Sequence, residues 1–193
     1  MLRRIATILC VAALAGCASG GQRITDFSDR SVGYGWLDLS GVGANRLHSV
    51  VIYQLRPQIE EPYYHVHVKK FEGGYLYYSF AFPSGAFKTY SATGQQCLGL
   101  LCSNTTFTYN FGKQGDEVGA AAIEQPGVYH FGTYQLDKVK TGFFEQGKFD
   151  VNTPEDAPSQ QAMLQEILKD AEDMDPIIAA RIQDELASKY AAR

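Results

Sequence analysis

The 193-residue sequence has four cysteines, a single tryptophan and no long hydrophobic run. Its apolar run from Ile5 to Ala13 is shorter than the roughly 20 residues that a membrane-spanning helix needs. Basic residues are also scarce, since 17 Lys and Arg stand against 21 Asp and Glu. Binding to nucleic acid relies on clustered Lys and Arg that contact phosphates. We therefore expect no nucleic-acid partner.

Motifs for nucleotide binding and nucleophilic catalysis are missing as well. Gly41-Val-Gly43 begins like a dinucleotide fingerprint, but Arg46 stands where the third glycine should be. The chain contains no Gly-Lys-Ser or Gly-Lys-Thr phosphate loop and no Gly-x-Ser-x-Gly nucleophile elbow. The acidic pairs Glu60-Glu61 and Asp116-Glu117 lie beside turns, where carboxylates are usually solvated. These absences predict a protein that is not an enzyme.

The amino terminus has the features of an export signal. Arg3 and Arg4 precede the apolar run, and Leu14-Ala15-Gly16-Cys17 follows it directly. A charged start, a short apolar core and small residues at the cut are typical of a secretory signal peptide. The Leu-Ala-Gly-Cys segment resembles the lipobox of bacterial lipoproteins. The resemblance implies that residues 1–16 are removed and that Cys17 carries the lipid (palmitate or other acyl chains) as a membrane anchor; the alternative is an ordinary signal peptide with an accidental cysteine.

The resemblance also bears on location. Removal of residues 1–16 takes away two of the 17 basic residues and leaves 15 against 21 acidic ones. Without a polybasic segment, the lipid must supply most of the membrane attachment. Ala18, rather than aspartate, follows the cysteine, and in proteobacterial lipoproteins this implies sorting to the outer membrane. We expect a lipid-anchored protein that faces the periplasm, with the cell surface as the alternative, and a flexible tether over residues 17–31.

The cysteines agree with export. Cys10 belongs to the signal, so Cys97 and Cys102 are the pair left for the folded part. Their spacing can close a small loop in an oxidising compartment. We predict a disulfide between Cys97 and Cys102; a reduced, metal-binding pair is the alternative.

Residues 32–151 have the pattern of one β domain. Tyr, Phe, Val and Thr are frequent there, and Gly and Pro interrupt the sequence at short intervals. Alternation with period two predicts strands over 47–55, 63–69, 75–82, 106–111, 117–124 and 127–136. Leu47, Val51, Tyr53 and Leu55 are predicted to share one face, and Gln125-Pro126-Gly127 to join the last two strands through a type II turn. The fold class is a mainly β, single antiparallel β-sandwich of about eight short strands.

Residues 152–193 change to a period of 3.6. Two helical stripes follow each other: Met163, Leu164, Ile167, Leu168 and Ala171, then Ile178, Ile182, Leu186 and Tyr190. Asp175-Pro176 suits the start of the second helix. We predict a C-terminal αα-hairpin that packs on the sandwich; a docking surface for a partner is the alternative.

Histidines offer a candidate metal site. His65 and His67 would project from the same face of one strand, where two imidazoles can chelate a metal ion, with His130, His48 or Glu72 as further ligands. The His-x-His pair followed by Glu72 resembles the first motif of cupins, which implies a metal-binding periplasmic protein. However, Ile59 stands in place of the motif's glycine. The other interpretation makes His65 and His67 a solvated strand face, His48 exposed, and His130 a hydrogen-bonded interior side chain.

Aromatic residues are concentrated between residues 63 and 82. The segment 75–82 carries rings on both faces, which predicts a strand buried on both sides if the helical hairpin covers its outer face. If the helices lie elsewhere, Tyr63, Tyr75 and Tyr77 form an exposed strip suited to a glycan or a protein partner.

Together these features predict a non-enzymatic envelope lipoprotein, anchored in the membrane through Cys17, whose sandwich binds or assembles an envelope partner. No cofactor is expected apart from the covalent lipid. The alternatives are a cupin-like metal-binding protein that uses His65 and His67, and a glycan-binding module that uses exposed tyrosines.

Overall fold

The computed structural model describes residues 24–98, 101–113, 118–139 and 149–190. The predicted signal peptide, the lipobox with Cys17 and the pair Asp116-Glu117 lie outside these ranges. Within them, no helix combines the length and the apolar character needed to cross a membrane.

The described ranges contain ten strands, one 3-10 helix and two α-helices. In chain order they are β1 (Ser31–Gly41), β2 (Arg46–Arg56), β3 (Tyr63–His65), β4 (His67–Phe71), β5 (Gly74–Phe82), β6 (Gly85–Leu98), β7 (Leu101–Asn110), η1 (Phe111–Lys113), β8 (Ala121–Ile123), β9 (Val128–Lys138), β10 (Phe149–Asn152), α2 (Gln160–Glu172) and α3 (Pro176–Tyr190).

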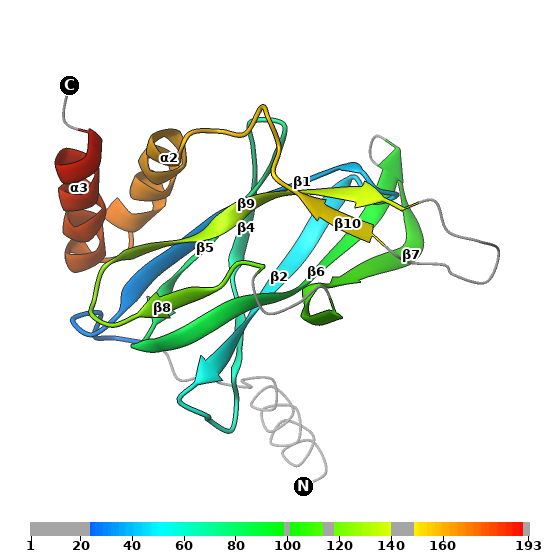
Figure 1. The fold of residues 1–193 in the computed structure, drawn as a ribbon. Coiled ribbons are helices and arrows are strands. Elements are labelled where there is room, and N and C mark those ends of the chain that lie inside the picture. Colours follow the sequence, from blue (N-terminus) through cyan, green and yellow to red (C-terminus); the bar gives the residue numbers. More distant parts are fainter. Residues whose placement is uncertain (1–23, 99–100, 114–117, 140–148, 191–193) are drawn as a thin grey trace, which may run out of the picture.

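The strands form two sheets, as Figure 1 shows. We call the sheet with order β10-β9-β1-β5-β4 sheet A, and the sheet with order β3-β2-β6-β7 sheet B; β8 also pairs with β6. The mainly β, sandwich-like fold with a C-terminal pair of helices confirms the predicted fold class. One detail differs, because β1 and β9 run parallel while the other described pairs are antiparallel.

Two predicted strand arrangements are wrong. The segments 117–124 and 127–136 do not form a hairpin, because β8 pairs with β6 in sheet B whereas β9 pairs with β1 and β10 in sheet A. The single strand 63–69 divides at Val66, since β3 pairs with β2 in sheet B and β4 with β5 in sheet A. In both places the chain crosses from one sheet to the other, a step that local alternation does not reveal.

A third correction concerns which face of β2 is buried. Leu47 is buried as expected, but Val50 and Ile52 are also buried, whereas Val51 and Tyr53 lie on the outer face. The register between β2 and β6 shifts between Leu47 and Ser49. An extra residue in a strand moves every later side chain to the opposite face. The predicted set of Leu47, Val51, Tyr53 and Leu55 is therefore split between the two faces.

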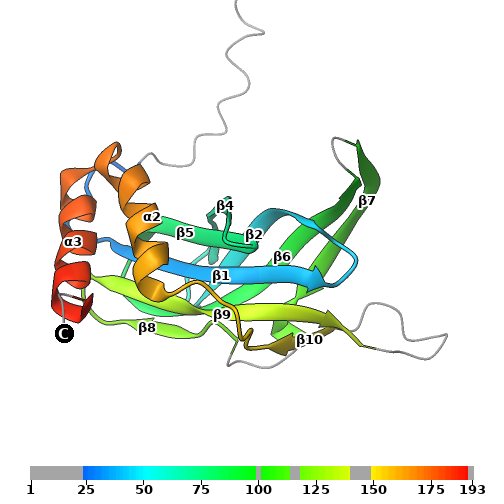
Figure 2. The same ribbon diagram turned by 90° about the horizontal axis from the view of Figure 1, so that it is seen from above.

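The apolar core has two layers. The first lies between the sheets and includes Leu37, Ile52, Tyr77, Phe87 and Phe131. The second lies between sheet A and the helices. Its buried members are Val32, Tyr34, Trp36, Leu76, Tyr78, Phe80, Met163, Leu164, Ile167, Ala171, Ile178, Ala179 and Ile182. Strand β5 contributes to both layers, so the prediction that the helical hairpin buries its outer face is confirmed; α2 and α3 lie side by side in Figure 2.

Strand β1 runs through the centre of sheet A and was not among the predicted strands. Its first part alternates large residues on the helix side with Gly33 and Gly35 on the inner side. A Cβ on Gly33 would overlap the rings of Phe82 and Phe131, and one on Gly35 would overlap Tyr77. The two glycines leave room for the aromatic rings of the inner core.

Each helix begins after a capping side chain, and the cap of the second helix is the predicted Asp175. Ser159 caps α2 by accepting a hydrogen bond from the backbone N–H of Ala162 at 3.1 Å. Asp175 caps α3 by accepting from the N–H of Ile177 at 2.8 Å. The predicted stripes lie on the buried faces of both helices. The end of the predicted tether is also fixed, because Arg181 of α3 donates to the carbonyl oxygens of Phe27, Ser28 and Arg30.

Candidate functional site

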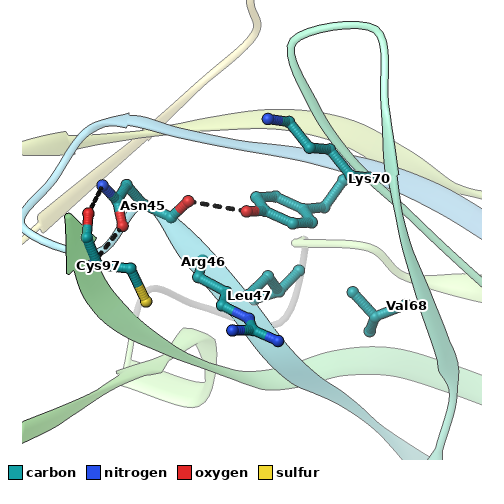
Figure 3. Close-up of a pocket in the computed structure, with 7 residues that line it drawn as sticks. Asn45, Arg46, Leu47, Val68, Lys70 and Cys97 are labelled. Carbon is teal, nitrogen blue, oxygen red and sulfur yellow. Dashed lines mark hydrogen bonds between the residues drawn. The ribbon is translucent and has the colours of Figure 1, made fainter. Parts of the chain in front are cut away.

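A pocket of about 510 Å³ opens between the two sheets, where β2 begins. Figure 3 shows it in close-up. The residues that line it come from β2 and the loop before it, from β4, β5 and β6: Asn45, Arg46, Leu47, Val68, Lys70, Tyr75 and Cys97. Leu47 and Val68 give the pocket an apolar wall.

Hydrogen bonds fix the uncharged polar residues of this pocket. The hydroxyl of Tyr75 donates to the backbone carbonyl of Asn45 at 2.7 Å. The side-chain amide of Asn45 donates to the carbonyl of Cys97, and its oxygen accepts from the N–H of Cys97, both at 2.7 Å. These bonds join the loop before β2 to β5 and β6, so this side of the pocket is ordered before any ligand arrives.

The charged residues of the pocket are both cations. Arg46 and Lys70 are exposed, and no carboxylate is among the described lining residues. Figure 3 shows their charged ends extending in opposite directions. The Arg46 guanidinium lies 3.8 Å from the sulfur of Cys102, which is disulfide-bonded to Cys97 as predicted. Two flexible cations beside an apolar wall can bind an anionic group that carries a less polar portion.

No sequence motif marks Arg46 or Lys70 as a ligand-binding residue. In the sequence, Arg46 is notable only because it interrupts a glycine motif. The two cations line one pocket because β2 and β4 lie in different sheets that face each other across it. No local spacing encodes that meeting, so no sequence signal could have found it.

The structure places the predicted metal ligands in different sheets and environments. His65 pairs with Val51 at the edge of sheet B, whereas His67 pairs with Tyr78 in sheet A and stacks on its ring at 5.5 Å. Both histidines are exposed, as the solvated-face interpretation predicts. Exposed His48 contacts Gln95 at 2.8 Å. Within the described ranges, no three His, Cys, Asp or Glu residues are placed to hold a metal ion together.

His67 lies at the edge of a second pocket of about 390 Å³, where sheet A meets α2. A polar network fastens the helix there. The Lys69 ammonium contacts Glu166 at 2.5 Å and Asp170 at 3.3 Å, and the Tyr78 hydroxyl donates to Asp170 at 2.5 Å. Burial raises the pKa of Tyr78, so the phenol stays protonated and keeps donating. This network explains how α2 is held against β4 and β5.

His130 of β9 is half-buried next to the helices. Gln160 donates to its Nδ1 at 3.3 Å, and its Nε2 contacts the Thr133 hydroxyl at 3.1 Å. The ring of Tyr34 lies 5.0 Å away, centroid to centroid. Burial, helped by the Lys189 ammonium, lowers the pKa of His130 to about 4. His130 is hydrogen-bonded as the interior interpretation predicts, but its side chain is half-buried and not fully interior.

The tyrosines are arranged differently from the predicted strip. Tyr77 is 1% exposed and belongs to the inner core, so it offers no surface. Tyr63 is 50% exposed and contacts Tyr53 and Tyr90, with ring centroids 5.2 and 5.3 Å from its own. Tyr53 reaches this outer face of sheet B because of the register shift in β2. The tyrosine cluster of Tyr53, Tyr63 and Tyr90 therefore replaces the predicted strip.

Comparison with known proteins identifies no family. No protein-family model and no curated protein matches the chain. Among solved structures, a 9R-lipoxygenase from Cyanothece is similar at 14% sequence identity and a TM-score of 0.28, over 95% of this chain and 28% of the lipoxygenase. A likeness this low carries no inference about fold or activity.

Proposed function

We propose that this chain is a bacterial envelope lipoprotein, anchored in the outer membrane through Cys17 and facing the periplasm. In this proposal the sandwich is a non-enzymatic binding module, and the pocket between β2 and β4 receives an anionic group of an envelope molecule. The observation that carries the proposal is the pair of cations, Arg46 and Lys70, in a pocket without a described carboxylate.

The charge balance of the whole chain makes this pocket distinctive. The formal net charge is −4, so two cations at one opening stand out against an acidic background. Neither Arg46 nor Lys70 forms an ion pair with a described carboxylate. Their charges are therefore available to a ligand, and we expect the affinity to fall with rising salt because exposed charges are screened.

A titration with small anions tests the proposal. Full-length protein in detergent is titrated with glycerol phosphate, and binding is followed by calorimetry. Replacing Arg46 and Lys70 by glutamine should weaken binding by about tenfold per charge removed. The matched control replaces Arg56 and Lys138, which are exposed outside this pocket, and changes the net charge equally. Equal losses in both double variants, or no binding by the wild-type protein, would contradict a specific anion site.

The tyrosine cluster supports a second candidate function, the binding of a glycan. A partly exposed group of rings on one sheet face suits the flat apolar face of a sugar. Retention on purified peptidoglycan should then fall when Tyr63 is replaced by alanine. It should persist in Tyr75→Ala, because the Tyr75 hydroxyl is bonded within the anion pocket. Equal retention of both variants would remove the glycan function.

A further inference from the structure

The β6–β7 hairpin ends in an exposed apolar tip formed by Leu98 and Leu101. These two residues are cross-strand partners, and their side chains are 86% and 79% exposed. No other large apolar side chain of the described ranges exceeds 50% exposure. The sequence from 89 to 112 contains no charged residue. Figure 1 shows the hairpin projecting from the sandwich at the end opposite α2 and α3.

The base of this leucine tip is firmly held. The disulfide joins Cys97 and Cys102, the neighbours of the two leucines. Asn45 bonds both the N–H and the carbonyl of Cys97 from the loop before β2. Ordering the tip in advance lowers the conformational entropy lost on binding. The leucines are therefore presented to a partner by a fixed support.

The chemistry of the leucine tip favours lipid over protein as the partner. Large apolar side chains exposed together mark interaction sites. The residues that dominate protein–protein interfaces are Trp, Tyr and Arg, with leucine under-represented. In contrast, uncharged aliphatic side chains partition readily into hydrocarbon. Arg46 lies beside the disulfide, where its guanidinium can meet the phosphates of lipid headgroups.

We propose that the leucine tip inserts into the surface of a lipid membrane, with Leu98 and Leu101 at the acyl boundary and Arg46 at the headgroups. The inference rests on the proposed function in one respect, which is the lipid on Cys17. A fully extended chain from Cys17 to Ile24 reaches at most about 25 Å, so the anchor keeps the domain close to the membrane. The tip then adds a second contact, which holds the domain along the membrane surface instead of leaving it to hang freely.

Fluorescence quenching tests insertion of the tip. The sequence has one tryptophan, Trp36, which is 3% exposed and gives a constant background. Full-length Leu98→Trp protein is reconstituted with phosphatidylcholine vesicles that contain some phosphatidylglycerol and lipids brominated on the acyl chain. The introduced indole should lose most of its emission and shift to the blue. The matched control is Ile59→Trp, an exposed apolar position (42%) between β2 and β3, which should keep its emission.

A second variant shows whether the tip itself drives insertion. Adding Leu101→Asp to Leu98→Trp places a carboxylate on the tip, and the quenching should disappear because the charge would have to leave water. Equal quenching at Leu98 and Ile59, or an unquenched indole at Leu98, would overturn the proposal; an indole that responds only to envelope protein would assign the tip to a protein partner. Flotation of the wild-type protein with vesicles in high salt reports separately on the anchor, so the two proposals fail independently.

Discussion

The stability of the fold should depend on pH through His130. Its imidazole is held neutral because burial disfavours the charged ring, and the Lys189 ammonium adds to this effect, so its pKa is about 4 instead of 6.5. The hydrogen bonds agree with a neutral ring, since Gln160 donates to Nδ1. A proton on Nδ1 would place an N–H donor of His130 against the amide N–H donor of Gln160. Gln160 in turn accepts from Tyr34 and Tyr190, so protonation would disturb the contact between sheet A and both helices.

The sign and size of the effect follow from this pKa. Below about pH 6.5 the unfolded chain binds a proton at this histidine, whereas the folded chain does not bind it until about pH 4. The contribution of His130 to stability is therefore complete above about pH 7 and is lost as the pH falls from 6.5 to 4. The full difference between the folded and unfolded pKa values of His130 corresponds to about 3 kcal/mol of unfolding free energy. Partial contact of the ring with solvent reduces it to about 2 kcal/mol.

Urea unfolding followed by Trp36 fluorescence measures this loss at about pH 7.5 and about pH 4.5. Replacing His130 by glutamine removes the titrating group. From the higher to the lower pH, the unfolding free energy of the wild-type protein should therefore fall by about 2 kcal/mol more than that of the variant. The control is His48→Gln, which makes the same substitution at an exposed histidine outside the contact between sheet A and the helices. The same pH dependence in the wild type and His130→Gln would refute the reasoning.

Three further predictions concern stability. Ile167 is fully buried between α2 and sheet A, and Ile167→Ala should lower the free energy of unfolding by about 3 kcal/mol in urea titrations; an unchanged midpoint would contradict the second core layer. Arg181→Ala removes charge-assisted bonds to the segment 27–30 and should lower the free energy of unfolding by about 2 kcal/mol. Proteolysis within 27–30 should become faster, and unchanged cleavage would contradict this attachment. Replacing Cys97 and Cys102 by serine should lower the free energy of unfolding by about 2 kcal/mol by the loop-entropy relation, as measured by thermal unfolding under oxidising conditions. Reductant should destabilise the wild-type protein by the same amount, and a different loss would contradict the prediction.

Local patterns in the sequence predicted the parts of the fold that local patterns determine. The helical stripes around Ile167 and Ile182 require only a period of 3.6, and both lie in the buried layer. The alternation over 106–111 likewise predicted a strand, and most of that segment lies in β7 (Leu101–Asn110). The double-sided burial of β5 could also be predicted, because rings on both faces of a strand need a cover on each side.

The remaining features depend on contacts between distant segments. The bulge near Ser49 is a property of the pairing with β6, and it alone decides that Tyr53 faces outwards. The crossing at Val66 reflects competition between two sheet edges, which the alternation of 63–69 does not reveal. The pocket lined by Arg46 and Lys70 depends on the same crossing, since β4 carries Lys70 and β2 carries Arg46. The candidate site could therefore not be predicted before the sheets were known.

The attachment of residues 27–30 to Arg181 has a mechanical consequence. Beyond this attachment the chain enters β1, which is hydrogen-bonded to β5 on one side and to β9 on the other. A pull on the amino-terminal side, with the far end of the sandwich held by a ligand or a membrane, acts along the length of β1. It therefore loads many backbone hydrogen bonds together, after the guanidinium has released its carbonyls. Under tension the bonds from Arg181 to residues 27–30 would break first, and the sandwich would keep its shape until the central strand slides.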